Sequence, residues 1–424
     1  MSLPQNLLYL PKPVAVRSRS YRSSVPTSNK SSFNAGDTMR FDIPCGQYGT
    51  YMNNSQSYLK FKVANTDGVT LTVQRHIASV FKNLSIYHAG NLLESIEDYG
   101  SLYCTLVDCQ VNAEDCQTVL SFQGCATHAS NNVALAGETM ATGTDKWFVM
   151  PIALSGVLGS QLGRYLPIGS MGGSDLRCEF QLNPLAKIIQ CADANLASSE
   201  FTISEAEFVT QIIELDPVAQ AEIDRQSQGV LQISSESYRH YSTTKSTESN
   251  VVFNIPAKFS SLKGIIVVHR STADAIQLVT GDAQSRTTAG LGSYNFRLGS
   301  LLVPQKAVIV NKSGATSGED GAEAWMEVEK LFASVSNIDS HSRITRASYG
   351  ISDASANGTF LIGMELESFS GSSTELLEQG INTLSTGVFF EGTYDNTPIA
   401  CNIDSWVNYD MMLVVSDGIC SARF

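Results

Sequence analysis

The sequence predicts an all-β protein made of two β-sandwiches in tandem, each with about eight strands and one short helix. The composition favours this class, since 43% of the residues are hydrophobic, only 16% are charged, and Ser, Thr, Gly, Val and Ile are frequent. A length of 424 residues is enough for two or three domains. Most telling, the same order of predicted elements occurs in both halves, although the sequence itself does not repeat.

In the first half, alternating apolar and polar residues predict strands over Asp37–Ile43, Tyr58–Val63, Lys146–Ile152 and Asp175–Leu182. Phe201–Leu215 is predicted to be a long strand or a bent pair. Strands with one apolar face are typical of antiparallel sheets that are half buried. Two stretches lack this alternation: Cys109–Thr144 is expected to be a long loop and Leu154–Arg164 a short helical turn.

A strand over Val80–Tyr87 and a turn at His88–Asn91 precede a change of period. Apolar residues then recur every three or four positions, which predicts a helix with an apolar stripe. The stripe consists of Leu92, Leu93, Ile96, Tyr99, Tyr103, Leu106 and Val107. Glu94, Glu97 and Asp98 are expected on its opposite face, near the helix start. A second helix is predicted in the other half, within Asp320–Val335.

The boundary between the halves is predicted at Asp216-Pro217, where Asp216 caps a helix over Val218–Gln226 that Gly229 ends. The expected domains are an extended arm over 1–35, a sandwich over 36–215, a linker over 216–229 and a second sandwich over 230–424. Strands of the second half are predicted over Gly229–Tyr241, Asn250–Ile255, Leu262–His269, Lys306–Val310, Thr359–Leu366, Thr386–Phe390, Ile399–Trp406 and Met411–Val415.

The charge distribution is uneven. The chain carries a net charge of −13, but its first 40 residues hold six basic residues against one acidic residue. A basic arm on an acidic body is typical of a segment that contacts phosphate, in nucleic acid or in lipid headgroups. Two other interpretations stay open: a solvated arm, or an arm packed on an acidic neighbouring subunit. The candidate contact residues are Lys12, Arg17, Arg19, Arg22 and Lys30.

No enzymatic, cofactor or metal motif is found, which favours a structural protein over an enzyme. The nine cysteines contain no C-x-x-C pair and are expected to be buried free thiols, in keeping with a reducing compartment. Glu365 and Glu367 alternate on a predicted strand. A carboxylate pair can cleave glycosides, but we interpret this one as the wet face of a sheet edge. The start of the chain is not expected to be a signal peptide, and no apolar run reaches the length of a membrane helix.

Four stretches carry a resemblance to a known family: SVFKNLSIYHAGNLLESIEDYGSL; EFVTQIIELDPVAQAEIDRQSQGVLQISSESYRHY; NVVFNIPAKFSSLKGIIVVHR; and ESFSGSSTELLEQGINTLSTGVFF followed by IDSWVNYDMMLVVSDG. The chain resembles the double jelly-roll major capsid proteins of tailless icosahedral DNA viruses, the lineage of adenovirus hexon and of virophage and polinton-like capsid proteins. The resemblance covers residues 36–424 and rests on the layout of elements.

The resemblance implies two tandem eight-stranded jelly rolls that form a pseudo-hexameric homotrimer, a capsomer that tiles the viral shell. It implies contacts with neighbouring capsomers and with penton and minor capsid proteins, and a location in the virion. The arm over 1–35 would lie on the inner side, linking neighbours or facing the genome or an inner membrane. Gln110–Thr144 and Ala273–Ser293 would be outer loops.

Two other functions are weighed. One is a tandem β-sandwich that binds or cleaves carbohydrate, which requires exposed aromatic side chains. Trp147, Trp325 and Trp406 lie in apolar patterns and are expected to be buried, which counts against it. The other is a minor capsid or spike protein, which usually has a single jelly roll or a fibrous extension.

Overall fold

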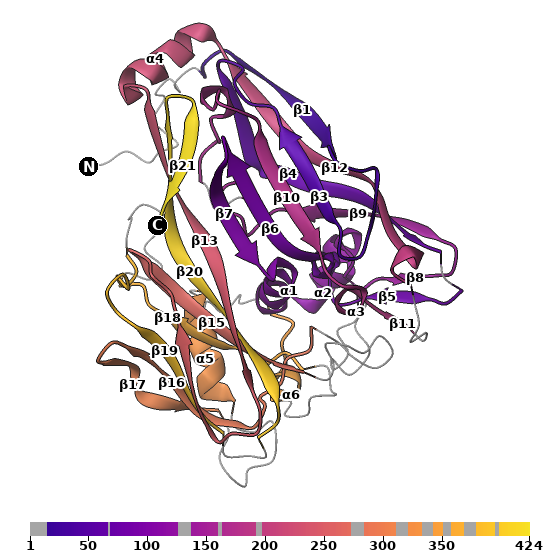
Figure 1. The fold of residues 1–424 in the computed structure, drawn as a ribbon, viewed down its shortest axis with the longest axis vertical. Coiled ribbons are helices and arrows are strands. Elements are labelled where there is room, and N and C mark those ends of the chain that lie inside the picture. The colour runs from indigo at the N-terminus through magenta and orange to yellow at the C-terminus, as the bar shows by residue number, and fades with distance from the viewer. Residues whose placement is uncertain are drawn as a thin grey trace, which may run out of the picture.

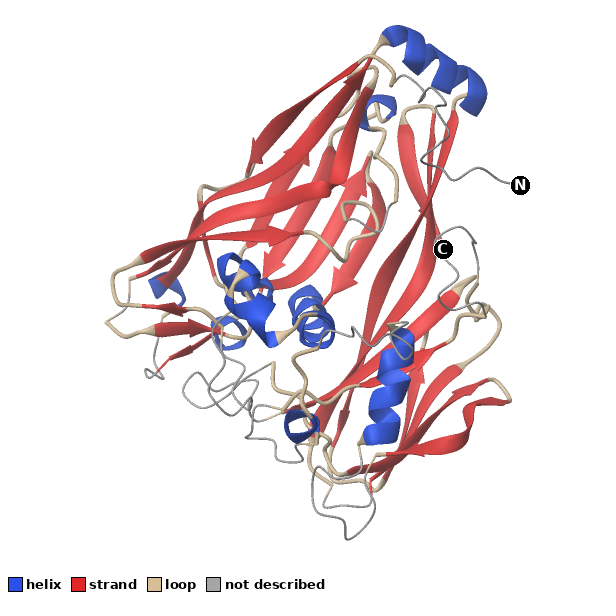
Figure 2. Ribbon diagram, turned by 180° about the vertical axis from the view of Figure 1, so that it is seen from behind, coloured by secondary structure: helices blue, strands red, loops and turns tan. Residues whose placement is uncertain are grey.

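Figure 1 shows the fold in a computed structural model of the chain. The structure describes residues 15–66, 68–125, 137–159, 163–191, 197–272, 284–310, 321–332, 342–350, 358–368, 379–394 and 398–424. Its strands gather into two groups with short helices between them and at their margins (Figure 2). These groups are the two predicted sandwiches.

The first sandwich has two main sheets in which all neighbouring strands are antiparallel. One sheet has the order β1 (Ser18–Pro26), β12 (Phe201–Leu215), β4 (Thr50–Asn65), β9 (Asp145–Pro151), with β2 (Ser32–Asn34) also paired to β12. The other has the order β3 (Thr38–Ile43), β10 (Leu176–Leu182), β6 (Phe81–His88), β7 (Asn91–Glu97). A small third sheet holds β11 (Ile189–Cys191), β5 (Leu71–Val73) and β8 (Thr139–Met140).

The second sandwich has the same arrangement. One sheet has the order β13 (Val230–Lys245), β20 (Cys401–Ser416), β15 (Leu262–Ser271), β18 (Ile362–Glu365), and β21 (Ile419–Arg423) extends it by pairing with β20. The facing sheet has the order β14 (Asn250–Ile255), β19 (Val388–Tyr394), β16 (Leu291–Leu298), β17 (Leu301–Ile309). The two strands predicted at the chain's end are thus one long strand, β20.

The two sandwiches share one topology. When the eight main strands of each are counted in chain order, one sheet reads first, eighth, third, sixth, and the other reads second, seventh, fourth, fifth. Four-strand sheets linked in this way form the jelly roll. The prediction of two eight-stranded sandwiches is confirmed, and each is a jelly roll.

The helices of the structure are α1 (Tyr99–Gln110), α2 (Ala113–Gln117), α3 (Leu185–Ile188), α4 (Pro217–Ser227), α5 (Ala322–Leu331) and α6 (Arg346–Tyr349), with 3-10 turns at Ile77–Val80, Val119–Gln123, Ile168–Ser170 and Ser198–Glu200. The linker helix α4 starts as predicted, since the Asp216 side chain accepts a hydrogen bond from the N–H of Val218 at 2.9 Å. The predicted helix in the second half is confirmed as α5. In each jelly roll the helix α1 or α5 lies between the fifth and sixth main strands.

The start of the first helix was predicted wrongly. Asn91–Glu97 is the strand β7, paired with β6, and α1 begins only at Tyr99. Ala89 and Gly90 both have positive φ (48° and 82°), so they form a tight hairpin turn. Pairing with β6 decides the conformation, because seven residues with mixed apolar spacing fit a strand or a helix equally well. Asp98, with φ at 51°, then separates the strand from the helix.

The second half of the expected arm also differs from the prediction. Ser18–Pro26 pairs along the whole of its length with β12, Ser32–Asn34 pairs with β12 as well, and Phe33 is fully buried. The fifteen-residue strand β12 offers an edge that would otherwise leave backbone groups unpaired, and β1 covers it. These residues therefore belong to the first jelly roll. Residues 1–14 lie outside the described part of the chain.

One of the two stretches expected to lack strands is more ordered than predicted. The described part of Cys109–Thr144 contains α2, a 3-10 turn and β8. In the described part of Leu154–Arg164, the N–H of Gly159 donates to the carbonyl of Ser155 at 2.8 Å, which agrees with the predicted short helical turn. All nine cysteines are free thiols, as predicted, and only Cys45 is partly exposed. In the described residues, no helix has the length and apolar character needed to cross a membrane.

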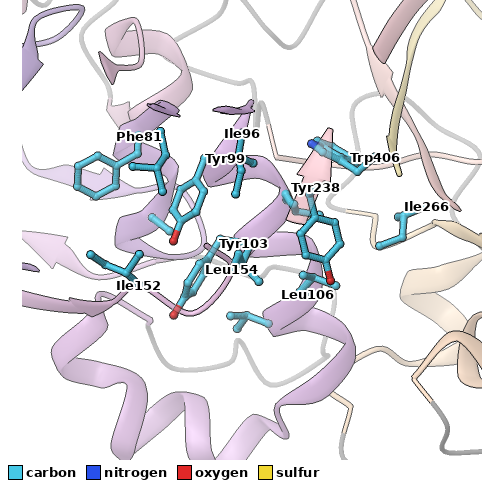
Figure 3. Packing of buried hydrophobic residues seen from close by; sticks show 14 of the residues in the cluster. Phe81, Ile96, Tyr99, Tyr103, Leu106, Ile152, Leu154, Tyr238, Ile266 and Trp406 are labelled. Carbon is cyan, nitrogen blue, oxygen red and sulfur yellow. The ribbon is translucent and has the colours of Figure 1, made fainter. Parts of the chain in front are cut away.

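Helix α1 is buried on nearly every side, with only Gln110 exposed among its residues. It contains one ionisable carboxylate, Asp108, among apolar and small polar residues, a composition suited to full burial. Figure 3 shows its Tyr99, Tyr103 and Leu106 close to side chains from both jelly rolls. Those neighbours include Ile152 and Leu154 from the first, and Tyr238, Ile266 and Trp406 from the second. The helix thus lies at the contact between the two.

Candidate functional site: the seam between the jelly rolls

Three acidic side chains from β7, α1 and their junction are buried where the first jelly roll meets the second. Glu94 is 2% exposed, Asp98 is 8% exposed and Asp108 is fully buried. Each accepts hydrogen bonds from the second jelly roll. We call these three residues and their partners the seam. Burial of a carboxylate is costly unless it is paired, so the partners decide whether the seam stabilises the protein.

Asp108 is held by three arginines. Its carboxylate accepts hydrogen bonds from Nη1 of Arg75 at 2.8 Å, Nη2 of Arg286 at 2.5 Å and Nε of Arg343 at 2.6 Å. Arg75 comes from the first jelly roll, whereas Arg286 and Arg343 come from the second. Burial by itself raises the pKa of Asp108, but the guanidinium charges outweigh burial and hold that pKa far below its usual range. The three guanidinium groups therefore favour the ionised form of Asp108.

The junction residue Asp98 binds the second jelly roll through Arg270 of β15. Asp98 Oδ2 accepts from Nη2 of Arg270, while Nε of Arg270 donates to Asp404 Oδ2 of β20 at 2.9 Å. Asp404 also accepts from His240 Nε2 at 3.0 Å. Although burial raises the pKa of Asp98, the charge of Arg270 outweighs it and the pKa is lowered. One guanidinium thus joins two carboxylates from different jelly rolls.

The same cluster contains side chains of the kinds that can bind a metal ion. Ligand atoms of Asp98, His240 and Asp404 lie within 4.8 Å of one another. However, the Arg270 guanidinium already bridges the two carboxylates, and a metal cation would have to displace it. The arrangement is that of an ion-pair network. A cavity of about 490 Å³ adjoins it, lined by basic and acidic side chains in balance, among them Lys82, Lys187 and Glu97.

Glu94 is satisfied without an opposite charge. Its carboxylate accepts from the hydroxyl groups of Ser155 and Ser237, both at 2.5 Å, and from the backbone N–H groups of Gly156 at 2.7 Å and Val157 at 3.3 Å. Ser237 lies on β13 of the second jelly roll, so Glu94 also accepts a hydrogen bond across the seam. Burial raises the pKa of Glu94, and the four hydrogen bonds oppose that rise only in part.

The structure describes four of the five basic residues predicted to bind phosphate, and these lie on or beside β1. Lys12 lies outside the described residues. Arg17 precedes β1, Arg19 and Arg22 lie on it, and Lys30 follows it. Arg19 Nε is paired with Glu214 at 2.5 Å and Lys30 Nζ with Asp37 at 3.0 Å. Acidic partners therefore offset part of the positive charge that the sequence places in this segment.

The carboxylates considered for glycosidase chemistry are also accounted for. Glu365 ends β18, which is the edge strand of its sheet. Glu367 pairs with Lys263 at 2.7 Å, and Lys263 also contacts Glu236. The interpretation as a sheet edge agrees with this position.

The tryptophans differ from expectation in two cases, since Trp325 is only partly buried and Trp147 is exposed. Trp406 is fully buried, but Trp147 is 46% exposed because it lies on the outer face of the edge strand β9. Nζ of Lys60 lies 4.5 Å from the centre of its ring. A ring covered by a lysine is a poor platform for a sugar.

Sequence reasoning missed the seam. It placed Glu94 and Asp98 on an exposed helix face and gave no role to Asp108. One signal was present: Arg270 lies two positions after the apolar run Ile265–Val268, and a guanidinium near the end of a buried strand requires an acidic partner.

Solved structures resemble this chain along its whole length. The capsid of PBCV-1 virus aligns with a TM-score of 0.67 at 10% identity, over 98% of this chain and 100% of that one. The double jelly-roll fold is thereby shown. The Faustovirus major capsid protein aligns with the double jelly roll at a TM-score of 0.60 and 9% identity, over 97% of this chain and 93% of that one. The mavirus major capsid protein aligns with a TM-score of 0.54 at 9% identity, over 100% of this chain and 93% of that one.

Because the sequence identities are so low, these alignments show that the fold is shared and nothing more. No protein-family model and no curated protein sequence matches the chain.

Proposed function

We propose that this double jelly roll is a viral major capsid protein, the subunit of a capsomer that tiles an icosahedral shell. The observation that carries the proposal is the full-length alignment with capsid proteins of PBCV-1, Faustovirus and mavirus. The alignment includes both jelly rolls in a common arrangement, which a chance likeness of one sandwich would not give. The role is structural, and no catalytic step is assigned to the chain.

The seam supports this role physically. A shell subunit has to transmit load between its two jelly rolls without letting them turn against each other. Ion pairs at Asp98 and Asp108 fix the orientation of the two, because buried charges tolerate only the geometry that keeps them paired. Apolar contacts around α1 add stability without that directionality.

Three copies of such a chain would place six similar jelly rolls around one axis, as a pseudo-hexagonal homotrimer. Contacts between copies would also cover sheet edges such as β9 and β18, which are otherwise open to pairing with other chains. Weaker polar contacts would join neighbouring trimers, and penton and minor capsid proteins would complete the shell.

The remaining placements follow from this proposal. The N-terminal residues, with Lys12, Arg17 and Arg22, would face the genome or an inner membrane. Gln110–Thr144 and Ala273–Ser293 would lie on the outer surface; residues 126–136 and 273–283 of these are outside the described part of the chain. The protein would reside in the virion. Nine free thiols suit assembly in a reducing compartment.

The mass of the purified protein by multi-angle light scattering tests the proposal. We expect a stable species at three times the chain mass of 45.8 kDa, which appears as hexagonal blocks in electron micrographs. A protein that stays monomeric at all concentrations contradicts it. The copy number in purified particles then separates a major capsid protein from a minor capsid or spike protein.

A further inference from the structure

An apolar groove of about 290 Å³ lies beneath the linker helix α4, where β12 of the first jelly roll runs beside β13 of the second. In Figure 1, α4 bridges the upper ends of these two strands. Ile213 and Leu215 of β12 form one wall, and Leu231 and Ile233 of β13 form the other. Ile223 of α4 forms the roof. The groove is thus built by both jelly rolls.

The lining is incompletely covered. Ile213, Leu215, Ile223 and Leu231 are only partly buried, and Tyr165 at the groove is 52% exposed. Contiguous apolar side chains that remain in contact with water favour the binding of another apolar segment. The volume is about twice that of a ~150 Å³ apolar cavity that takes up benzene, so it has room for two leucine-sized side chains.

The first described residues of the chain lie beside this groove. The carbonyl of Arg17 accepts a hydrogen bond from the N–H of Asp216 at 3.0 Å, and Ser18 pairs with Leu215, a residue of the groove wall. Residues 1–14 therefore leave the described structure at the upper end of β12. Position 8 is nine residue steps from Arg17, and a fully extended chain of nine steps spans at most about 30 Å.

The composition of that segment matches the groove. Residues 7–10 read Leu-Leu-Tyr-Leu, and the first eleven residues of the chain contain no charged side chain. Pro11 and Pro13 follow, and prolines favour an extended connection that needs no hydrogen-bond partner for its missing N–H groups. The sequence thus contains an apolar tetrapeptide a few residues before the point at which the described chain meets an apolar groove.

We propose that Leu7–Leu10 bind in this groove of the same chain. The segment then joins the two jelly rolls at the end near α4, whereas the seam joins them at α1. Lys12 and Arg17 remain outside the groove. The inference does not depend on the capsid proposal, since it concerns contacts within one chain.

Disulfide trapping in the full-length protein tests this inference. The variant Leu8→Cys/Tyr165→Cys would be oxidised with diamide, which takes up the two electrons and two protons released as the two thiols form one S–S bond. We expect a cross-link within one chain, seen as a species of single-chain mass on a non-reducing gel and as a joined peptide pair by mass spectrometry. A matched pair, Leu8→Cys/Val252→Cys, uses an exposed residue of β14 and should not cross-link.

A further substitution checks that the groove itself holds the segment. Adding Ile223→Glu places a charge in the apolar lining and should lower the cross-link yield about tenfold. Adding Met326→Glu on the exposed side of α5 should leave the yield unchanged. A cross-link between two chains would assign the groove to the segment of a neighbouring copy and overturn the proposal. The absence of any cross-link, or equal yields with Val252→Cys, would overturn it as well.

Discussion

Nε of Arg343 donates a hydrogen bond of 2.6 Å to the carboxylate of Asp108, although the two residues are 235 positions apart and belong to different jelly rolls. Both are buried, at 4% and 0% exposure. An ion pair removed from water in this way has little tolerance for displacement, because either partner left alone would carry an uncompensated buried charge. This pair therefore fixes how the two jelly rolls sit against each other.

Substitution Asp108→Asn should destabilise the protein strongly. It leaves three buried guanidinium groups around a neutral amide, and loss of one partner of a buried ion pair costs about 3–5 kcal/mol. Urea denaturation measures the loss. The control is Asp37→Asn, which breaks the exposed pair with Lys30 and should cost far less. Similar losses in both variants would show that the seam adds no stability.

Acid should destabilise the protein from about pH 6.5 downward. Burial lowers the pKa of both His76 and His269 to about 3. Unfolded histidines bind protons below about pH 6.5, while the folded protein keeps both neutral, so the unfolded state binds more protons. Stability therefore falls between pH 6.5 and 3, by up to about 1.4 kcal/mol per pH unit for each histidine.

Denaturant midpoints measured from pH 8 to pH 4 test this dependence. The variant His269→Gln should show a shallower decline, since one of the two groups no longer titrates. Asp98 and Asp108 add a further loss only below about pH 4, as the lowered pKa of each means that protonation removes a favourable charge. If the denaturant midpoint of the variant falls with pH as steeply as that of the unaltered protein, His269 does not contribute to the acid sensitivity.

Substitution Gly100→Ala should displace α1. A Cβ atom there would lie 2.5 Å from the carbonyl oxygen of Phe81 and closer still to that of Ala78. Overpacking of this kind costs about 1–3 kcal/mol. The control Gly172→Ala meets no heavy atom within 4 Å and should be neutral. Thermal unfolding compares the two, and equal melting temperatures would mean that α1 shifts without cost.

The basic residues near the N-terminus should contribute unequally to anion binding. Arg19 and Lys30 are paired with Glu214 and Asp37, so their charges are already partly offset. The triple variant Lys12→Gln/Arg17→Gln/Arg22→Gln should lose affinity for anionic vesicles by about fivefold per residue. Arg19→Gln/Lys30→Gln should lose less. Sedimentation with vesicles, and separately with duplex DNA, measures both, and a larger loss in the double variant would contradict the proposed surface.

Local patterns predicted most of the strands and two helices correctly. Alternation identified strands such as Asp37–Ile43, and the Asp216-Pro217 cap located α4, because both signals are complete within a few residues. The turn of the β6–β7 hairpin was predicted, but its second strand was missed because the apolar spacing of Leu92, Leu93 and Ile96 fits a helix as well as a strand. Strand β1 was missed since its sequence has little apolar character and its pairing partner, β12, is about 190 residues away.

The seam could not be predicted for a related reason. Glu94, Asp98 and Asp108 look like exposed residues when only their neighbours in sequence are considered. The burial of Asp98 and Asp108 depends on Arg270, Arg286 and Arg343, which come from the other half of the chain. Glu94 likewise accepts a hydrogen bond from the distant Ser237. Nothing in the local spacing indicates which distant arginine will be the partner.

The charged character of the seam also matters while the protein is being made. When the ribosome has completed the first jelly roll, the second has not yet been synthesised. Asp98 and Asp108 then lack their partners from it, Arg270 and Arg343. In this state Asp98 lacks Arg270 and Asp108 keeps only Arg75, so both carboxylates favour contact with water. A purely apolar surface of the same extent would invite association between nascent chains. The acidic residues that later hold the finished molecule together thus help the half-synthesised chain avoid aggregation.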